Sequence, residues 1–157
     1  MQKITTFLWF DSQAEEAANF YASIFKNSRI LEVSRYGDGA PFPAGTAMTV
    51  RYELDGQEFI ALNAGPQFKF NEAISLYVDC ADQAEVDYYW ETLVDGGEPS
   101  QCGWLKDRYG LSWQIIPSEL PKLLGDPDPE RAQRATQAMF TMTKIDVEAL
   151  RRAHAGS

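Results

Sequence analysis

The sequence of 157 residues predicts an α+β fold, in which two βαβββ modules form one curved mixed sheet with helices outside, followed by a helical C-terminal tail. Three observations lead to this prediction. The segment from Phe7 is similar to the segment from Ser75, short strands follow each copy, and the pattern becomes helical after Ser118. Because one module cannot cover its own sheet, we expect the two modules to pair.

The repeat emerges when FLWFDSQAEEAANFYASIF, from Phe7, is aligned with SLYVDCADQAEVDYYWETL, from Ser75. Asp11 then falls on Asp79, an offset of 68 residues. Each copy is an apolar strand, an aspartate and a helix with apolar residues at three-to-four spacing. We expect the aspartate, or the residue after it, to cap the helix by accepting backbone N–H bonds.

The elements follow in order along each module. In the first we expect a helix, then three strands with an Asp55-Gly56 hairpin turn, at 12–25, 29–35, 47–54 and 57–63. In the second we expect a helix ended by Asp95-Gly96-Gly97, then three strands, at 82–94, 99–102, 104–107 and 111–116. The paired modules therefore span 1–117, as about 1–66 and 70–117.

The segment 118–157 is predicted to be a separate helical extension, with helices at 129–142 and 147–155 and Asp128 as a cap. Its alanine and methionine spacing is typical of helices that pack on another surface. That surface belongs either to the same subunit or to a partner, and we predict a homodimer.

Composition excludes several classes of partner. The net charge is −9, and the stretch from Phe70 to Leu105 contains no Lys or Arg, so we expect no nucleic-acid binding. No apolar run reaches the roughly 20 residues that cross a bilayer, so we expect no membrane insertion. Two cysteines, without a signal peptide, favour reduced thiols in a cytoplasmic protein.

Several stretches carry a resemblance to a known family. They are TFLWFDSQAEEAANFYASIF, DGQEFIALNAGP, QCGWLKDRYGLSWQIIP and, in the tail, DPDPERAQRATQAMFTMTKID. With these stretches the chain resembles the PhnB-like group, also described as demethylubiquinone methyltransferase-like, of the vicinal oxygen chelate superfamily. The superfamily includes glyoxalase I, bleomycin-resistance proteins and extradiol dioxygenases. The resemblance implies the duplicated βαβββ fold and a dimer, but little about the reaction.

The resemblance also implies where a metal site would lie. Metal-dependent members of the superfamily use two His on the first strands and two Glu on the last strands of the modules. The matching positions here are Thr5, Ala73, Ile60 and Gln114, which supply neither imidazole nor carboxylate. Since divalent ions need about three or four such ligands, we predict no metal and no cofactor at this site.

The junctions between first strand and helix, FDSQAEE and VDCADQAE, contain no glycine. A nucleotide-type methyl donor is usually bound at a glycine-rich turn of this kind. We therefore do not expect methyl transfer.

Gln114 is the strongly polar side chain in the centre of the last strand, and an amide can both donate and accept hydrogen bonds. The other residues expected on the same face are Phe7, Trp9, Leu62, Ser75, Tyr77 and Ser112. An aromatic lining with a few polar groups is typical of a small-molecule pocket. The alternative is that the aromatic rings fill the cavity.

Cys102, in QCGW, is the candidate for a catalytic residue, and a buried inert thiol is the alternative. Cys80 is expected at the start of the second helix, where either the helix dipole lowers its thiol pKa or the residue only belongs to the capping region. Asp107 lies at a hairpin end and is expected to face water. Three hypotheses follow: a metal-free small-molecule-binding protein, a metal-independent isomerase, lyase or transferase that uses Cys102, or a structural dimer with a filled cavity.

Overall fold

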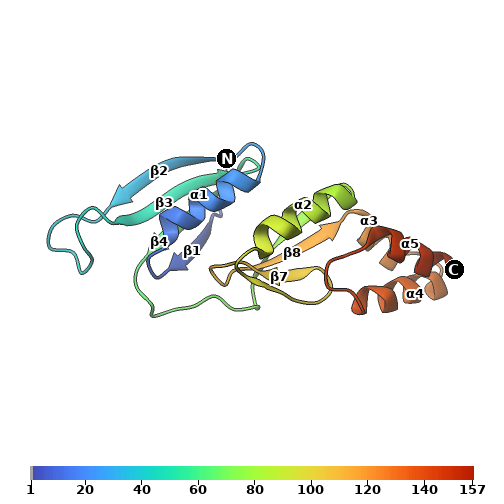
Figure 1. Cartoon of the computed structure of the whole chain (residues 1–157). Coiled ribbons are helices and arrows are strands. Elements are labelled where there is room, and N and C mark those ends of the chain that lie inside the picture. The colour runs from blue at the N-terminus through green and yellow to red at the C-terminus, as the bar shows by residue number, and fades with distance from the viewer. Residues whose placement is uncertain (1) are drawn as a thin grey trace. The chain divides into compact units, whose positions relative to one another are not determined.

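The computed structural model describes residues 2–157, which form two compact units that divide between Phe70 and Asn71 (Figure 1). Within these residues each unit contains one βαβββ module with a four-stranded mixed sheet, which confirms the predicted α+β fold. The pairing of the two modules into one curved sheet stays a prediction.

The first unit contains five elements: β1 (Thr6–Phe10), α1 (Ala14–Ile24), β2 (Arg29–Arg35), β3 (Ala47–Leu54) and β4 (Gln57–Asn63). The strand order is β1-β4-β3-β2, with β1 parallel to β4 and the other neighbours antiparallel. Asp55 and Gly56 have φ angles of 51° and 79° between β3 and β4, as a tight two-residue hairpin turn requires. The three predicted strands of this hairpin region are confirmed.

Helix α1 buries one face against this sheet, through Ala14, Ala17, Ala18, Tyr21 and Ile24. Asn63, at the end of β4, accepts a 2.8 Å hydrogen bond from the N–H of Ala14 and donates one to the carbonyl of Ala47. The expected cap from Asp11 or Ser12 is therefore wrong. A buried amide from a distant strand satisfies the helix terminus instead.

The second unit begins with β5 (Ser75–Cys80), α2 (Gln83–Val94), β6 (Glu98–Pro99), β7 (Trp104–Lys106) and β8 (Ser112–Pro117). The strand order is β5-β8-β7-β6, with β5 parallel to β8. Helix α2 packs on β7 and β8. Its cap is Asp82, which accepts a hydrogen bond from the N–H of Glu85, so the expected cap at Asp79 or Cys80 is wrong.

The repeat offset of 68 residues is also wrong. The buried helix residues correspond at an offset of 69, because Ala17, Tyr21 and Ile24 of α1 match Val86, Trp90 and Leu93 of α2. On the first strands the offset is 70, because Phe7 pairs with Ile60 as Tyr77 pairs with Gln114. Asp11 follows its strand whereas Asp79 lies inside β5, so aligning the two aspartates shifts the register.

The tail adds α3 (Glu119–Leu124), α4 (Pro129–Phe140) and α5 (Val147–Ala155), which lie together at one end of the second sheet (Figure 1). Helix α3 was not predicted. A buried cluster joins the tail to β8 through Ile116, Leu120, Ile145 and Leu150. The tail therefore packs on the second module of its own chain. No helix among residues 2–157 combines the length and apolar character that a bilayer crossing requires.

Asp107 lies at the hairpin between β7 and β8, and its side chain is only 2% exposed. Its carboxylate accepts hydrogen bonds from the indole N–H of Trp113 at 2.8 Å and from the backbone N–H groups of Tyr109 and Leu111. The expectation that Asp107 faces water is wrong. Three donors converge on this carboxylate, and their hydrogen bonds stabilise the hairpin between β7 and β8.

Candidate functional site

Strand β8 presents two different faces, because successive side chains of a strand point in opposite directions. Trp113 and Ile115 are almost fully buried on the face that meets α2. Gln114 and Ile116 lie on the other face, where Ile116 contacts the tail. The strand thus places one amide side chain on the face that the tail partly covers.

A pocket of about 560 Å³ lies on this face, wholly within the second unit. Its walls come from the sheet (Tyr77, Trp104, Gln114, Ile116), from the turn before β7 (Ser100, Gln101, Cys102) and from the tail (Leu120, Pro121, Leu124, Met139, Phe140). The volume suits a small organic molecule, and the lining is largely apolar and aromatic.

One end of the side-chain amide of Gln114 forms a hydrogen bond, and the other end forms none with residues 2–157. Its Nε2 donates a 2.9 Å hydrogen bond to the hydroxyl of Ser75 on β5. No hydrogen bond from residues 2–157 reaches its Oε1, and the side chain is only partly buried. If the amide is turned round, its Oε1 accepts from Ser75 and its NH₂ becomes the open end. Gln114 lines the pocket, and in either orientation one polar group of its amide has no hydrogen-bond partner among residues 2–157.

Tyr77 lies beside Gln114 on β5 and is 53% exposed. Partial burial raises the pKa of its phenol, and the nearby Asp79 carboxylate adds to the shift. The phenol therefore stays protonated at neutral pH, so that it can donate as well as accept a hydrogen bond.

Cys102 lines the same pocket and is partly buried. Its φ angle is 58°, which is rare for a residue other than glycine, and the adjacent Gly103 has a φ of 86°. The N–H groups of Cys102 and Gly103 donate 2.8 Å bonds to the carbonyls of Met142 and Thr143 in the tail. A Cβ at Gly103 would lie 2.8 Å from Ile116 Cδ1, so the Cys-Gly pair fits a turn pressed between β8 and the tail.

Cys80 is fully buried, and burial raises the pKa of its thiol to about 12, with further contributions from Glu85 and Asp79. The expectation that the start of α2 lowers this pKa is wrong. Desolvation and carboxylates outweigh the helix dipole, so Cys80 remains a neutral thiol.

Part of the predicted site lies together within the second unit. Tyr77, Cys102 and Gln114 surround the pocket, Ser75 supports Gln114, and Ser112 is buried at an adjoining hollow. Phe7, Trp9 and Leu62 lie on the first sheet, in the other unit. There Trp9 donates a 3.0 Å hydrogen bond to the carbonyl of Gly65 and meets Phe68 edge to face.

The sequence-based prediction of the pocket missed its wall from the tail, above all Leu124, Met139 and Phe140. The apolar spacing in the tail signalled packing, but not which surface it would meet. At the proposed metal positions, Ile60 and Gln114 lie in β4 and β8 as expected, whereas Thr5 and Ala73 precede their strands. Among residues 2–157 no three His, Cys, Asp or Glu side chains gather as a metal site would require.

Comparison with known proteins identifies relatives over most of the chain. A family model described as 3-demethylubiquinone-9 3-methyltransferase matches residues 2–116. The PhnB protein of Bacillus cereus is 40% identical, with a TM-score of 0.70 over 74% of this chain and 99% of its own. No curated protein is significantly similar.

Two more distant structures share the fold. Protein PA1353 of Pseudomonas aeruginosa is 20% identical, with a TM-score of 0.61 over 74% of this chain and 98% of its own. The fosfomycin resistance protein FosX of Mesorhizobium loti is 13% identical, with a TM-score of 0.51 over 72% of this chain and 90% of its own. The family match ends at residue 116, so the tail that walls the pocket lies outside it.

Proposed function

The chain belongs to the family described as 3-demethylubiquinone-9 3-methyltransferase, within the PhnB-like group of the vicinal oxygen chelate superfamily, and we propose that it binds a small, partly aromatic or apolar molecule in a metal-free pocket. The amide end of Gln114 that has no partner among the described residues, in a largely apolar wall of the second unit, is the observation that carries this proposal. Such a group orients a carbonyl, amide or hydroxyl on a ligand whose body contacts Tyr77 and Trp104.

The hydrogen bond from Gln114 to Ser75 supports a role of Gln114 in ligand binding. A free glutamine side chain has many rotamers, and fixing it on binding costs entropy. The hydrogen bond to Ser75 fixes the amide beforehand, so less of the binding free energy is spent on ordering it. The amide of Gln114 is thus preorganised for ligand binding.

The test measures binding of naphthalenemethanol, a neutral aromatic alcohol, by isothermal titration calorimetry on the full chain. Gln114→Ala is expected to weaken binding by about five- to tenfold, the usual contribution of one buried hydrogen bond. Gln137→Ala, on the exposed side of α4 and outside the pocket lining, is the matched control and should bind like the wild type. Equal affinity of the Gln114 variant and the wild type for naphthalenemethanol would contradict the proposal.

A second candidate function is a metal-independent isomerase, lyase or transferase that uses Cys102. The observation in its favour is that a thiol in a rare backbone conformation lines the same pocket. Iodoacetamide labelling across pH measures the thiol pKa, which a nucleophile should hold well below about 8.5. Buried Cys80 is an internal control that should stay unlabelled. An unreactive Cys102 removes this candidate.

The structure offers no support for methyl transfer. The helix starts that would hold a nucleotide-type donor are capped by the protein itself, α1 by Asn63 and α2 by Asp82. Calorimetry with S-adenosylmethionine is expected to show no binding.

Homodimerisation stays a prediction, and sedimentation velocity can measure it. The alternative of a structural dimer with a filled cavity depends on the same measurement.

A further inference from the structure

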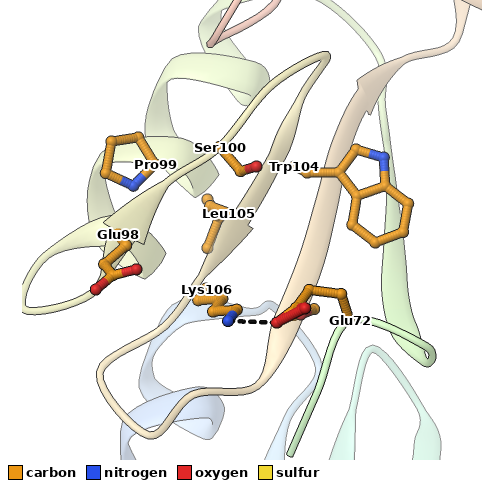
Figure 2. Close-up of a pocket in the computed structure, with 8 residues that line it drawn as sticks. Glu72, Glu98, Pro99, Ser100, Trp104, Leu105 and Lys106 are labelled. Atoms are coloured by element: carbon orange, nitrogen blue, oxygen red, sulfur yellow. Dashed lines mark ion pairs between the residues drawn. The ribbon is translucent and has the colours of Figure 1, made fainter.

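A smaller hollow of about 300 Å³ adjoins the candidate pocket and shares Ser100 and Trp104 with it (Figure 2). Its remaining lining comes from Glu72, Glu98, Pro99, Leu105, Lys106 and Ser112. Unlike the candidate pocket, it contains three charged side chains. The two hollows together offer an apolar compartment beside a polar one.

Ser112 is the most informative residue of the polar compartment. It is only 1% exposed, and its hydroxyl has no hydrogen-bond partner among residues 2–157. A buried hydroxyl without a partner costs about 1–3 kcal/mol, so such groups are uncommon. Ser112 also lines the hollow, so its hydroxyl is the candidate partner for a polar group that binds there.

The charges of the polar compartment sum to a negative value. Lys106 forms an ion pair with Glu72 (Figure 2), and this contact raises the pKa of Lys106 and lowers that of Glu72. Glu98 is a second carboxylate that lines the hollow and acts on the same ammonium group, and among residues 2–157 it forms no ion pair. An anion entering the hollow would meet two carboxylates and one neutralised ammonium.

Trp104 lines both compartments. The face of an indole attracts a cation and also packs against a planar apolar group. One side chain thus suits both ends of a ligand that combines a positive head with an aromatic body.

We propose that the hollow formed by Glu72, Glu98, Lys106 and Ser112 binds the protonated amine of a ligand whose aromatic body occupies the adjoining pocket. The ammonium donates hydrogen bonds to the Ser112 hydroxyl and to a glutamate carboxylate. This inference rests on the proposed function, since it needs the larger pocket to hold the body of the ligand.

Three probes with one aromatic body and different heads test the proposal: naphthylmethylamine, naphthalenemethanol and naphthoate. Calorimetry on the full chain is expected to show the amine binding about three- to tenfold more tightly than the alcohol, and the acid most weakly. The preference should shrink in about 1 M salt, where charges are screened within about 3 Å. An amine that binds no better than the alcohol, or an acid that binds best, overturns the proposal. Failure of all three probes to bind overturns the proposed function as well.

Variants assign the preference to named residues. Glu72→Gln combined with Glu98→Gln should bring the affinity for the amine down to that for the alcohol and leave the alcohol unchanged. Glu91→Gln, an exposed glutamate on α2 outside the hollow, is the control that should keep the preference. Ser112→Ala should weaken the amine about threefold or more without lowering the melting temperature, because it removes a hydroxyl without a partner. An unchanged preference in the double variant contradicts the assignment.

Discussion

The side-chain amide of Gln114 lies 2.9 Å from the hydroxyl of Ser75, so two neighbouring parallel strands, β8 and β5, jointly present one oriented polar group. In the first module the corresponding strand residue is Ile60, which has no such group. The two modules share a fold but not this chemistry. The polar pair gives the second unit its candidate site.

Removing Ser75 should therefore affect binding through Gln114. Ser75→Ala leaves Gln114 in place but frees its rotamers, so we expect affinity for naphthalenemethanol to fall about two- to threefold, less than for Gln114→Ala. The double variant should bind like Gln114→Ala alone, because the two residues act as one unit. Calorimetry of the four proteins measures this, and additive losses would contradict coupling between Ser75 and Gln114.

The Asp107 carboxylate should be important for stability rather than for binding. Asp107→Ala leaves the indole N–H of Trp113 and two backbone N–H groups without their acceptor. We expect the free energy of unfolding to fall by about 2–4 kcal/mol in urea denaturation. Asp95→Ala, at an exposed carboxylate in the same unit, should cost less than about 1 kcal/mol. Equal losses would mean that the buried network does not stabilise the hairpin.

Phe140 connects the tail to the pocket. It is 62% exposed, so Phe140→Ser should cost little stability, yet it removes an aromatic part of the pocket wall. We expect about a three- to tenfold loss of affinity for naphthalenemethanol with a nearly unchanged melting temperature. Tyr88→Ser, at another exposed aromatic residue outside the pocket, is the comparison. If both variants bind like the wild type, the tail takes no part in the site.

Acid should loosen the tail before the first module. A hydrogen bond and the charge of Arg151 lower the pKa of Glu119 below its ordinary 4.5. Hydrogen bonds from Lys144 and Gln83 lower the pKa of Asp87 below its ordinary 3.8. Hydrogen bonds from the backbone of Asp128 and from His154 lower the pKa of Asp126 below its ordinary 3.8. A lowered folded-state pKa means stability that is present above the ordinary value and lost as pH falls through the lowered one.

Hydrogen exchange read by mass spectrometry tests this dependence between pH 6 and 2. Once the intrinsic exchange rate is corrected for pH, protection of residues 118–157 should fall as pH drops below about 4. Residues 2–70 should keep their protection to lower pH. Earlier loss in the first module would show that these carboxylates do not govern docking of the tail.

Strands with clear alternation and a glycine turn were predictable from the sequence, and β2, β3 and β4 have the expected ends. Helix α3 was not, because it is short and carries Pro121, which a first turn tolerates. The capping of α1 by Asn63 depends on a contact 49 residues away in sequence, which no local pattern encodes.

The site divides in the same way. Period-two alternation was sufficient to place Tyr77 and Gln114 on one face. Cys102 was expected at the end of a strand over 99–102, but β6 ends at Pro99 and Cys102 lies in the turn before β7, so that expectation is wrong. The wall from Met139 and Phe140 depends on where the tail docks, and the orphan hydroxyl of Ser112 depends on packing around it. Both features depend on tertiary packing, which the local sequence does not encode.

The most direct measurement is a ¹H–¹⁵N correlation spectrum of the full chain titrated with naphthalenemethanol, because it reports the side-chain amide of Gln114 and the indole N–H of Trp104 individually. We predict that these two signals, with the backbone signals of Tyr77 and Met139, shift saturably and more than the rest. A titration that leaves these signals unmoved, or that shifts a different surface, would contradict a binding pocket at Gln114.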